Sequence, residues 1–291
     1  MRTPFDPPLN AVRAAVQRAL DEDLGPLGDL TAALVPSGAV VAAALRARGE
    51  GVLAGRACAE EAFAQVDPSL GVHWHHADGD DLHPGDVIAD VEGPLASVLT
   101  AERTALNFLC HLSGVASLTH RFVVAARAGR AETKVWDTRK TLPGLRALEK
   151  AAVRAGGGVN HRGSLSDFVL VKDNHLAGLT ITESVRLAME RWPARTVEVE
   201  CDRAEQVAEA VAAGATLIMF DNMSPEQVRA CVALVAGRAL VEVSGGVTLD
   251  TIGAYAAAGA DVISTSLITQ SAPAFDIGLD LVTTRDRSGE W

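Results

Sequence analysis

Apolar and polar positions alternate with two periods along the second half of the chain. Short β-rich runs bounded by turn residues predict strands at residues 134–138, 168–172, 196–201, 215–220, 240–245 and 261–266. Apolar repeats of helical period separate these runs, and Ser224 before Pro225 is typical of an N-cap followed by the first helical residue. Four consecutive strands begin about 20 to 25 residues apart, which indicates the βα units of a parallel barrel or a doubly wound sheet.

The first 115 residues follow another pattern. Strand-like segments at 42–55 and 84–93 contain turn residues and lie among helical patterns at 11–20, 57–66 and 101–128. We therefore expect a separate α+β domain ahead of the α/β domain. The predicted fold class is α/β.

Composition agrees with this class. The 291 residues are 48% hydrophobic but only 4% aromatic, so we expect a core of small aliphatic side chains. The N-terminus lacks the apolar segment of a signal peptide, and no apolar run approaches the roughly 18 residues of a membrane span. Four widely separated cysteines form no CxxC pair, so neither a disulfide framework nor a zinc knuckle is predicted. These features favour a reducing, cytoplasmic location without a membrane partner.

Charge is distributed unevenly. The formal net charge of −11 argues against a nucleic-acid partner, but residues 121–172 contain eleven Lys or Arg against four Asp or Glu. This local surplus predicts an anionic ligand. A solvated basic helix face is the alternative for Arg146, Lys150 and Arg154, spaced four residues apart. It does not account for Arg139, Lys140, Arg162 and Lys172.

Polar residues stand at the carboxyl ends of the predicted strands, where the loops of a parallel barrel surround a common mouth. Successive strand ends carry Asp137, Arg139 and Lys140; Lys172; Glu200; Asp221; and Ser244, Gly245 and Gly246. This series predicts one functional site. The glycines could present backbone N–H groups to a phosphate, whereas the sequence contains no Walker A loop and no dinucleotide-binding fingerprint.

Alternation within residues 196–201 places Glu198 and Glu200 on one strand face and the valines on the other. With the valines against the helices, both carboxylates face the barrel axis. Inward carboxylates need compensating cations, for which Lys172, Lys140 or Mg2+ are the candidates. A buried ion-pair network without a catalytic role is the other interpretation, and it suits Glu198 better than Glu200.

Two segments place histidines among polar residues. Residues 73–83 hold four histidines and three aspartates without the spacing of a known metal motif, so a solvated loop is expected. His161 and Arg162 follow a glycine run and precede a predicted strand. Their basic surroundings favour anion binding over a loop histidine with purely local hydrogen bonds.

Together these motifs resemble those of quinolinate phosphoribosyltransferases. The longest is DTRKTLPGLRALEKAAVRAGGGVNHR at 137–162, and the similarity covers nearly the whole chain through segments 21–31, 49–55, 101–109, 170–175, 197–202, 221–229, 242–252 and 276–281. The resemblance implies an N-terminal α+β sandwich in residues 1–115, an incomplete parallel α/β barrel in 116–274 and a C-terminal segment, 275–291, that packs back on the first domain. It also implies conversion of quinolinate and phosphoribosyl pyrophosphate to nicotinate mononucleotide, CO2 and pyrophosphate, in de novo NAD biosynthesis.

The resemblance also assigns roles to residues. The pyridine dicarboxylate would be bound by Arg139, His161, Arg162 and Lys172, with Arg103 supplied across a homodimer that shares its active sites, with or without further assembly. Lys140 would face the phosphoribosyl pyrophosphate, and Glu200 and Asp221 its ribose hydroxyls and the cofactor Mg2+, held indirectly through the substrate. The 5-phosphate would be held by Ser244, Gly245, Gly246, Ser264, Thr265 and Ser266. The predicted catalytic residues are Lys140, Lys172, Glu200 and Asp221.

Three positions depart from the family pattern. Ser266 and Gln270 replace a common Gly and His in the last phosphate loop, and Gly163 stands where Met often follows the NHR motif.

Two other functions are alternatives to this interpretation. A paralogue of the same fold could act on another acid such as nicotinate, although Arg103, Arg139 and Arg162 favour two carboxylates. A catalytically silent nucleotide-binding or scaffolding protein would be expected to lose the carboxylates, yet Glu200 and Asp221 are present.

Overall fold

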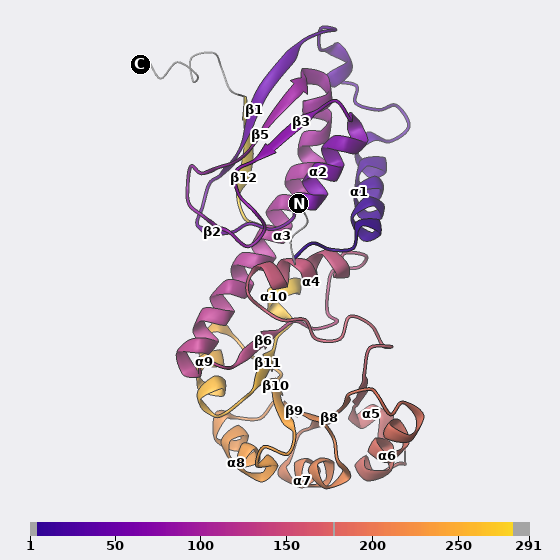
Figure 1. The fold of residues 1–291 in the computed structure, drawn as a ribbon, viewed down its shortest axis with the longest axis vertical. Helices are drawn as coiled ribbons and strands as arrows, with labels where there is room; N and C mark the ends of the chain where they lie inside the picture. The colour runs from indigo at the N-terminus through magenta and orange to yellow at the C-terminus, as the bar shows by residue number, and fades with distance from the viewer. Residues whose placement is uncertain (1–4, 177, 282–291) are drawn as a thin grey trace. The chain divides into compact units, whose positions relative to one another are not determined.

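The computed structural model describes residues 5–176 and 178–281, which form two compact units (Figure 1). Unit 1 contains the described residues within 1–118, 142–157 and 271–291, and unit 2 contains Thr119–Thr141 and Gly158–Gln270. The division into 1–115, 116–274 and 275–291 stays a prediction, and its residues 282–291 lie outside the described residues. The units group residues 142–157 with the N-terminal part of the chain.

Unit 1 is built on a four-stranded antiparallel sheet. Its order is β12-β1-β5-β3, from β1 (Val40–Ala47), β3 (Gly71–Trp74), β5 (Val87–Pro94) and β12 (Ile277–Leu281), while β2 (Gly51–Val52) pairs with β4 (Asp81–Leu82). The helices are α1 (Leu9–Leu24), the 3-10 helix η1 (Ala32–Leu34), α2 (Arg56–Val66), α4 (Arg146–Ala155) and the first part of α3 (Leu95–Gly129). Because β12 pairs with β1 from Ala43↔Leu281 to Ala47↔Ile277, the described end of the chain completes the N-terminal sheet.

The 35-residue helix α3 is long and apolar enough to cross a membrane by length and composition alone. Polar residues interrupt its apolar positions, so α3 contains no uninterrupted apolar run of that length. Its most apolar 18 residues have a mean hydropathy of 1.2, and 56% of that window is buried. Leu109, Leu112 and Val115 are among its core side chains. A buried core helix of a globular domain has the same composition as a short span.

The basic residues of α4 do not form the solvated face suggested by their spacing. Lys150 is buried, and Arg154 donates hydrogen bonds to the carbonyl oxygens of Lys150 at 3.2 Å and Phe5 at 3.1 Å. Glu149, also fully buried, contacts His111 of α3 at 2.9 Å. Packing within unit 1 covers this face, and the helical period alone could not show that.

Unit 2 is a six-stranded parallel sheet of order β6-β11-β10-β9-β8-β7. Its strands are β6 (Lys134–Trp136), β7 (Val169–Val171), β8 (Val197–Cys201), β9 (Leu217–Asp221), β10 (Leu240–Ser244) and β11 (Val262–Ser264). Its helices are α5 (Asp173–Leu176), α6 (Ile181–Arg191), α7 (Ala204–Ala213), α8 (Pro225–Val235), α9 (Leu249–Ala257) and α10 (Leu267–Gln270), and α6 to α9 pack along the strands (Figure 1). Since β6 and β7 lie at the two ends of this order and do not pair with each other in the described part of the chain, the barrel is incomplete. This confirms the predicted fold class.

Local signals in the sequence direct these βα units. Ser224 caps α8 by accepting a hydrogen bond from the Gln227 N–H at 3.3 Å, with Pro225 at the first helical position. Gly214 ends α7 at φ 86°, a left-handed conformation that favours glycine. Parallel strands joined in this way bring their carboxyl ends to one edge of the sheet.

Candidate active site

A pocket of about 540 Å3 lies at the carboxyl ends of the unit 2 strands. The predicted site residues that line it are Arg139, Lys140, His161, Arg162, Lys172, Glu200, Asp221, Ser244, Gly245, Gly246 and Ser264. Thr265 and Ser266 do not line it, and Thr265 is buried with its hydroxyl donating to the Val247 carbonyl at 3.4 Å. Arg103 is an exposed residue of α3 in unit 1.

Two guanidinium groups line one part of this pocket. Arg162 is largely buried, and its Nη1 donates to the Phe168 carbonyl at 3.3 Å. Burial lowers the pKa of Arg162, and the positive charge of Arg139 lowers it further. Two cations that repel each other in a confined space favour an anion between or beside them.

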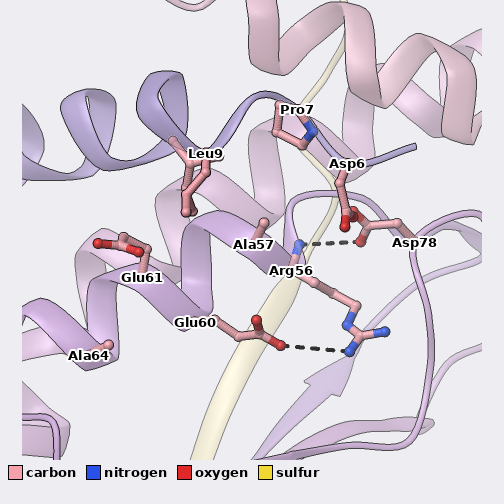
Figure 2. A pocket seen from close by; sticks show the side chains of 10 residues that line it. Asp6, Pro7, Leu9, Arg56, Ala57, Glu60, Glu61, Ala64 and Asp78 are labelled. Atoms are coloured by element: carbon pink, nitrogen blue, oxygen red, sulfur yellow. Dashed lines mark hydrogen bonds and ion pairs between the residues drawn. The ribbon is translucent and has the colours of Figure 1, made fainter. Parts of the chain in front are cut away.

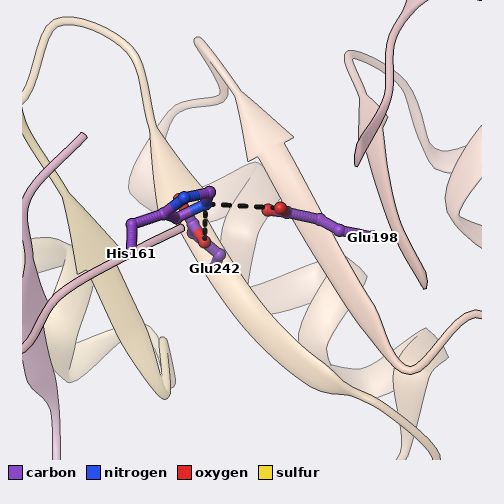
Figure 3. Close-up of side chains that lie close together, drawn as sticks. All are labelled: His161, Glu198 and Glu242. Atoms are coloured by element: carbon purple, nitrogen blue, oxygen red, sulfur yellow. Dashed lines mark ion pairs between the residues drawn. The ribbon is translucent and has the colours of Figure 1, made fainter. Parts of the chain in front are cut away.

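His161 lies between two buried carboxylates (Figure 3). Its Nε2 is 3.3 Å from Glu198 Oε2 and 3.5 Å from Glu242 Oε2. Burial alone would lower the pKa of His161, but the interactions with Glu198 and Glu242 outweigh it and raise the pKa to about 9. For Glu198, burial raises the pKa, and the nearby Glu242 charge adds to that effect. The two carboxylates thus favour the protonated form of His161.

The loop that carries His161 is attached to β6 by Asp137. This fully buried carboxylate accepts hydrogen bonds from the His161 backbone N–H at 2.8 Å and from Asn160 Nδ2 at 2.7 Å. A parallel bridge between Trp136 and Val159 extends the attachment. Asp137 is thus a support for the anion-binding loop and does not line the pocket itself.

Lys172 and Glu200 form an ion pair between their Nζ and Oε2 atoms on the wall of the pocket. Lys172 follows β7 directly, and Glu200 lies near the end of β8, the neighbouring strand. Lys172 is one of the candidate cations expected to compensate the inward carboxylates. Lys172 compensates the charge of Glu200. The partner of Glu198 is His161, which the sequence analysis did not name among the compensating cations.

Backbone N–H groups and hydroxyls come together at the end of β10. Gly245 and Gly246 have φ values of 89° and 62°, and a side chain on Gly245 would collide with Asn222. The Ser264 hydroxyl donates to the Ser244 hydroxyl at 3.1 Å. Directly after β9, Asn222 Nδ2 donates to Asp221 Oδ2 at 2.8 Å and so orients that carboxylate. Such a turn can hold a phosphate group.

Sequence reasoning missed Glu242 and Asn222, which both line the pocket. The signal for Glu242 was available: it alternates with Val241 and Val243, as Glu198 alternates with Val197 and Val199. Asn222 adopts φ 56°, a backbone state that a motif search does not reveal.

Another pocket, of about 340 Å3, lies in unit 1 (Figure 2). Its buried Asp78 accepts hydrogen bonds from the backbone N–H groups of Gly55 and Arg56, both at 3.2 Å, and burial raises its pKa to about 6. Arg56 also pairs with Glu60 at 3.6 Å. Asp78 therefore stabilises the start of α2, a structural role.

The histidine-rich residues 73–83 are partly strand β3, and His75 pairs with Asp90 at 2.9 Å. Among the described residues, the group with metal-ligand spacing is His161, Glu198 and Glu242.

A parallel α/β sheet with cations, carboxylates and a glycine turn around one pocket defines an α/β-barrel enzyme for anionic substrates. The chain matches the family models "Quinolinate phosphoribosyl transferase, N-terminal domain" over residues 29–113 and "C-terminal domain" over residues 115–280. It is 41% identical over 267 residues to a probable nicotinate-nucleotide pyrophosphorylase [carboxylating] of Bacillus subtilis, covering 91% of each chain. It is 40% identical to the nicotinate-nucleotide pyrophosphorylase [carboxylating] of Mycobacterium leprae over 94% of this chain and 98% of that one.

Among solved structures, the nicotinate-nucleotide pyrophosphorylase from Francisella tularensis superposes with a TM-score of 0.91 at 35% identity, over 97% of this chain and all of that one. The chain belongs to the quinolinate phosphoribosyltransferase family. The resemblance read from the sequence motifs is thereby confirmed.

Proposed function

We propose that this protein transfers the phosphoribosyl group of phosphoribosyl pyrophosphate to quinolinate, with loss of CO2, in NAD biosynthesis. The observation that carries the proposal is the pocket that joins Arg139, His161, Arg162 and Lys172 to Glu200, Asp221 and the 244–246 turn. One part is cationic, and the other offers carboxylates and backbone amides. This composition suits a flat dianion beside a phosphorylated sugar.

In this reaction the protein mainly has to bind and stabilise charged groups, and general acid–base catalysis has a smaller part. The bond from C1 of the ribose to the pyrophosphate oxygen breaks, and its electron pair leaves with pyrophosphate while the pyridine nitrogen bonds to C1. The ring nitrogen then carries a positive charge. Cleavage of the bond between C2 and its carboxylate releases CO2 and leaves an electron pair on C2, which the adjacent cation stabilises until a proton adds there. Arg139, Arg162 and Lys172 would bind the carboxylates, and Lys140 would stabilise the departing pyrophosphate.

Mg2+ is part of the proposal. Glu200 and Asp221 lie at the ends of neighbouring strands, and oxygen ligands of this kind suit Mg2+ bound mainly through water and substrate oxygens. The ion would supply charge neutralisation for the pyrophosphate. Within the protein, Glu200 pairs with Lys172, and Asn222 orients Asp221.

We infer further that the active unit is a homodimer with shared sites. Arg103 carries a cation on the exposed side of α3, in the unit that does not contain the pocket residues. By family resemblance it would complete the site of the partner subunit. A cytoplasmic location is proposed as well, since Cys58, Cys110, Cys201 and Cys231 are all free thiols.

Turnover with purified components tests the activity. The protein is incubated with quinolinate, phosphoribosyl pyrophosphate and Mg2+, and nicotinate mononucleotide is measured by mass spectrometry. Arg162→Gln, which removes a buried guanidinium from the pocket, should lower kcat/KM for quinolinate at least about 100-fold. A wild-type protein that forms no nicotinate mononucleotide contradicts the proposal.

A further inference from the structure

One histidine meets two carboxylates from separate strands at the wall of the pocket. In Figure 3 the side chains of Glu198, on β8, and Glu242, on β10, both point toward the ring of His161. Both glutamates are completely buried, and His161 is 8% exposed. His161 and Glu242 line the pocket, whereas Glu198 does not. These three side chains are called the Glu–His–Glu cluster below.

Fold stability alone does not account for this cluster. Glu198 and Glu242 occupy mid-strand positions between valines, and replacing buried ion pairs by apolar side chains is often neutral or stabilising. None of their four carboxylate oxygens has a hydrogen-bond partner among the described residues. The carboxylates therefore interact with His161 mainly through charge. Their role is to stabilise the charge of this histidine, and they add little to the stability of the sheet.

The geometry requires a proton on Nε2, and the two carboxylates that face it favour the charged form of the ring. Nε2 lies 3.3 Å from one carboxylate oxygen and 3.5 Å from the other. An unprotonated Nε2 would place a lone pair against two carboxylates, which is repulsive, so the nitrogen carries a proton. The raised pKa of His161 agrees with this arrangement.

Other contacts fix where the ring lies. The Trp136 ring meets it edge-on with centroids 5.4 Å apart, and the Phe168 ring lies 5.0 Å away. Asp137 holds the backbone N–H of the same residue at 2.8 Å. The ring is thus held in place by aromatic packing and by its backbone, while the carboxylates determine its charge.

We propose that Glu198 and Glu242 are positioning residues that hold His161 as an imidazolium at the pocket wall, where its charge is in place before the acid substrate binds. This inference rests on the proposed function, because the acid is the pyridine dicarboxylate named above. Glu198 and Glu242 act through His161 and do not bind the substrate.

The proposal and simple electrostatics predict opposite changes in the KM for quinolinate when a glutamate is replaced. If the glutamates only add negative charge near the site, replacing one by glutamine should tighten binding of a dianion and lower its KM. If they keep His161 charged, the same replacement removes a cation from the site and raises KM. Glu198→Gln and Glu242→Gln preserve side-chain size, so the sign of the change separates the two cases.

Steady-state kinetics of these two variants and of the double variant are the first part of the test. The proposal predicts a rise of at least about tenfold in KM for quinolinate, with less than about a twofold change in kcat and in KM for phosphoribosyl pyrophosphate. Asp90→Asn is the matched control, since it removes a carboxylate from the exposed His75 and should leave all three constants unchanged. An unchanged or lower KM for quinolinate in the glutamine variants overturns the proposal.

Nitrogen-15 NMR of histidine-labelled wild-type protein is the second part, with His161 assigned by difference from His161→Gln. Protonation of both ring nitrogens at pH 7.5, lost in the double variant, supports the proposal. A neutral His161 ring in the wild type overturns it, as does a stoichiometric metal ion bound to the purified protein at this cluster. The wild-type measurement needs neither turnover nor a folded variant of the glutamates, so it still decides the charge of His161 if quinolinate proves not to be the substrate.

Discussion

Asp137 accepts a hydrogen bond from the backbone N–H of His161 across 2.8 Å, and its carboxylate is completely buried. The residue that follows the first strand of the barrel thereby fixes the loop that carries two pocket cations, His161 and Arg162. The long sequence motif at residues 137–162 thus has a physical basis, since Asp137 at its start contacts His161 near its end.

Replacing Asp137 should therefore disturb one end of the pocket selectively. Asp137→Asn loses one acceptor and leaves a buried donor poorly satisfied. We expect KM for quinolinate to rise about tenfold and KM for phosphoribosyl pyrophosphate to change less than about twofold, as measured by steady-state kinetics. Thermal unfolding of the variant provides the control for global damage. Equal increases in the two KM values would show that Asp137 has no selective role.

The charged state of His161 predicts a pH dependence of stability. Its pKa rises from 6.5 to about 9 in the folded protein because its ion pairs outweigh burial. The stabilisation is fully present below the unfolded pKa of 6.5 and is lost as pH rises through about 9. Denaturant unfolding between pH 6 and 10 should thus show a fall in the free energy of unfolding that is smaller in His161→Gln. Identical pH profiles for the two proteins would refute the assignment.

Removal of Mg2+ tests the role proposed for Glu200 and Asp221. Turnover should stop in EDTA and return when Mg2+ is added, because the ion is expected to bind mainly through substrate phosphates. Equilibrium dialysis of the ligand-free protein should show little tight Mg2+ binding. Full activity in EDTA contradicts the metal proposal without affecting the assignment of the acid substrate.

Mixed dimers test whether Arg103 serves the partner's site. Arg103→Ala and Lys140→Ala should each be nearly inactive, because each loses a charge-assisted contact to an anionic substrate. If Arg103 acts across the interface, one site of a mixed dimer carries both defects and the other carries neither. Random reassembly of equal amounts should then restore roughly a quarter of wild-type activity. With subunit exchange confirmed by native mass spectrometry, no recovery would show that Arg103 acts within its own chain or not at all.

The strands and most of the pocket were predictable from sequence because their signals are local. Strand alternation placed Glu200 on the inner face, and the positions at the carboxyl ends of successive strands identified Lys172, Asp221 and Ser244. Other features depend on tertiary packing. The period of α4 could not show that Lys150 would be buried, and the partnership of His161 with Glu242 joins residues about 80 positions apart.

The most direct measurement is the fate of a labelled carboxylate. Quinolinate carrying carbon-13 in its C2 carboxylate is incubated with the protein, phosphoribosyl pyrophosphate and Mg2+, and labelled CO2, nicotinate mononucleotide and pyrophosphate are measured. The account predicts the three products in equal amounts, and kcat/KM for nicotinate at least about 100-fold lower than for quinolinate, since one missing carboxylate leaves buried guanidinium donors unpaired. Equal turnover of the two acids, or nucleotide formation without release of labelled CO2, would contradict it.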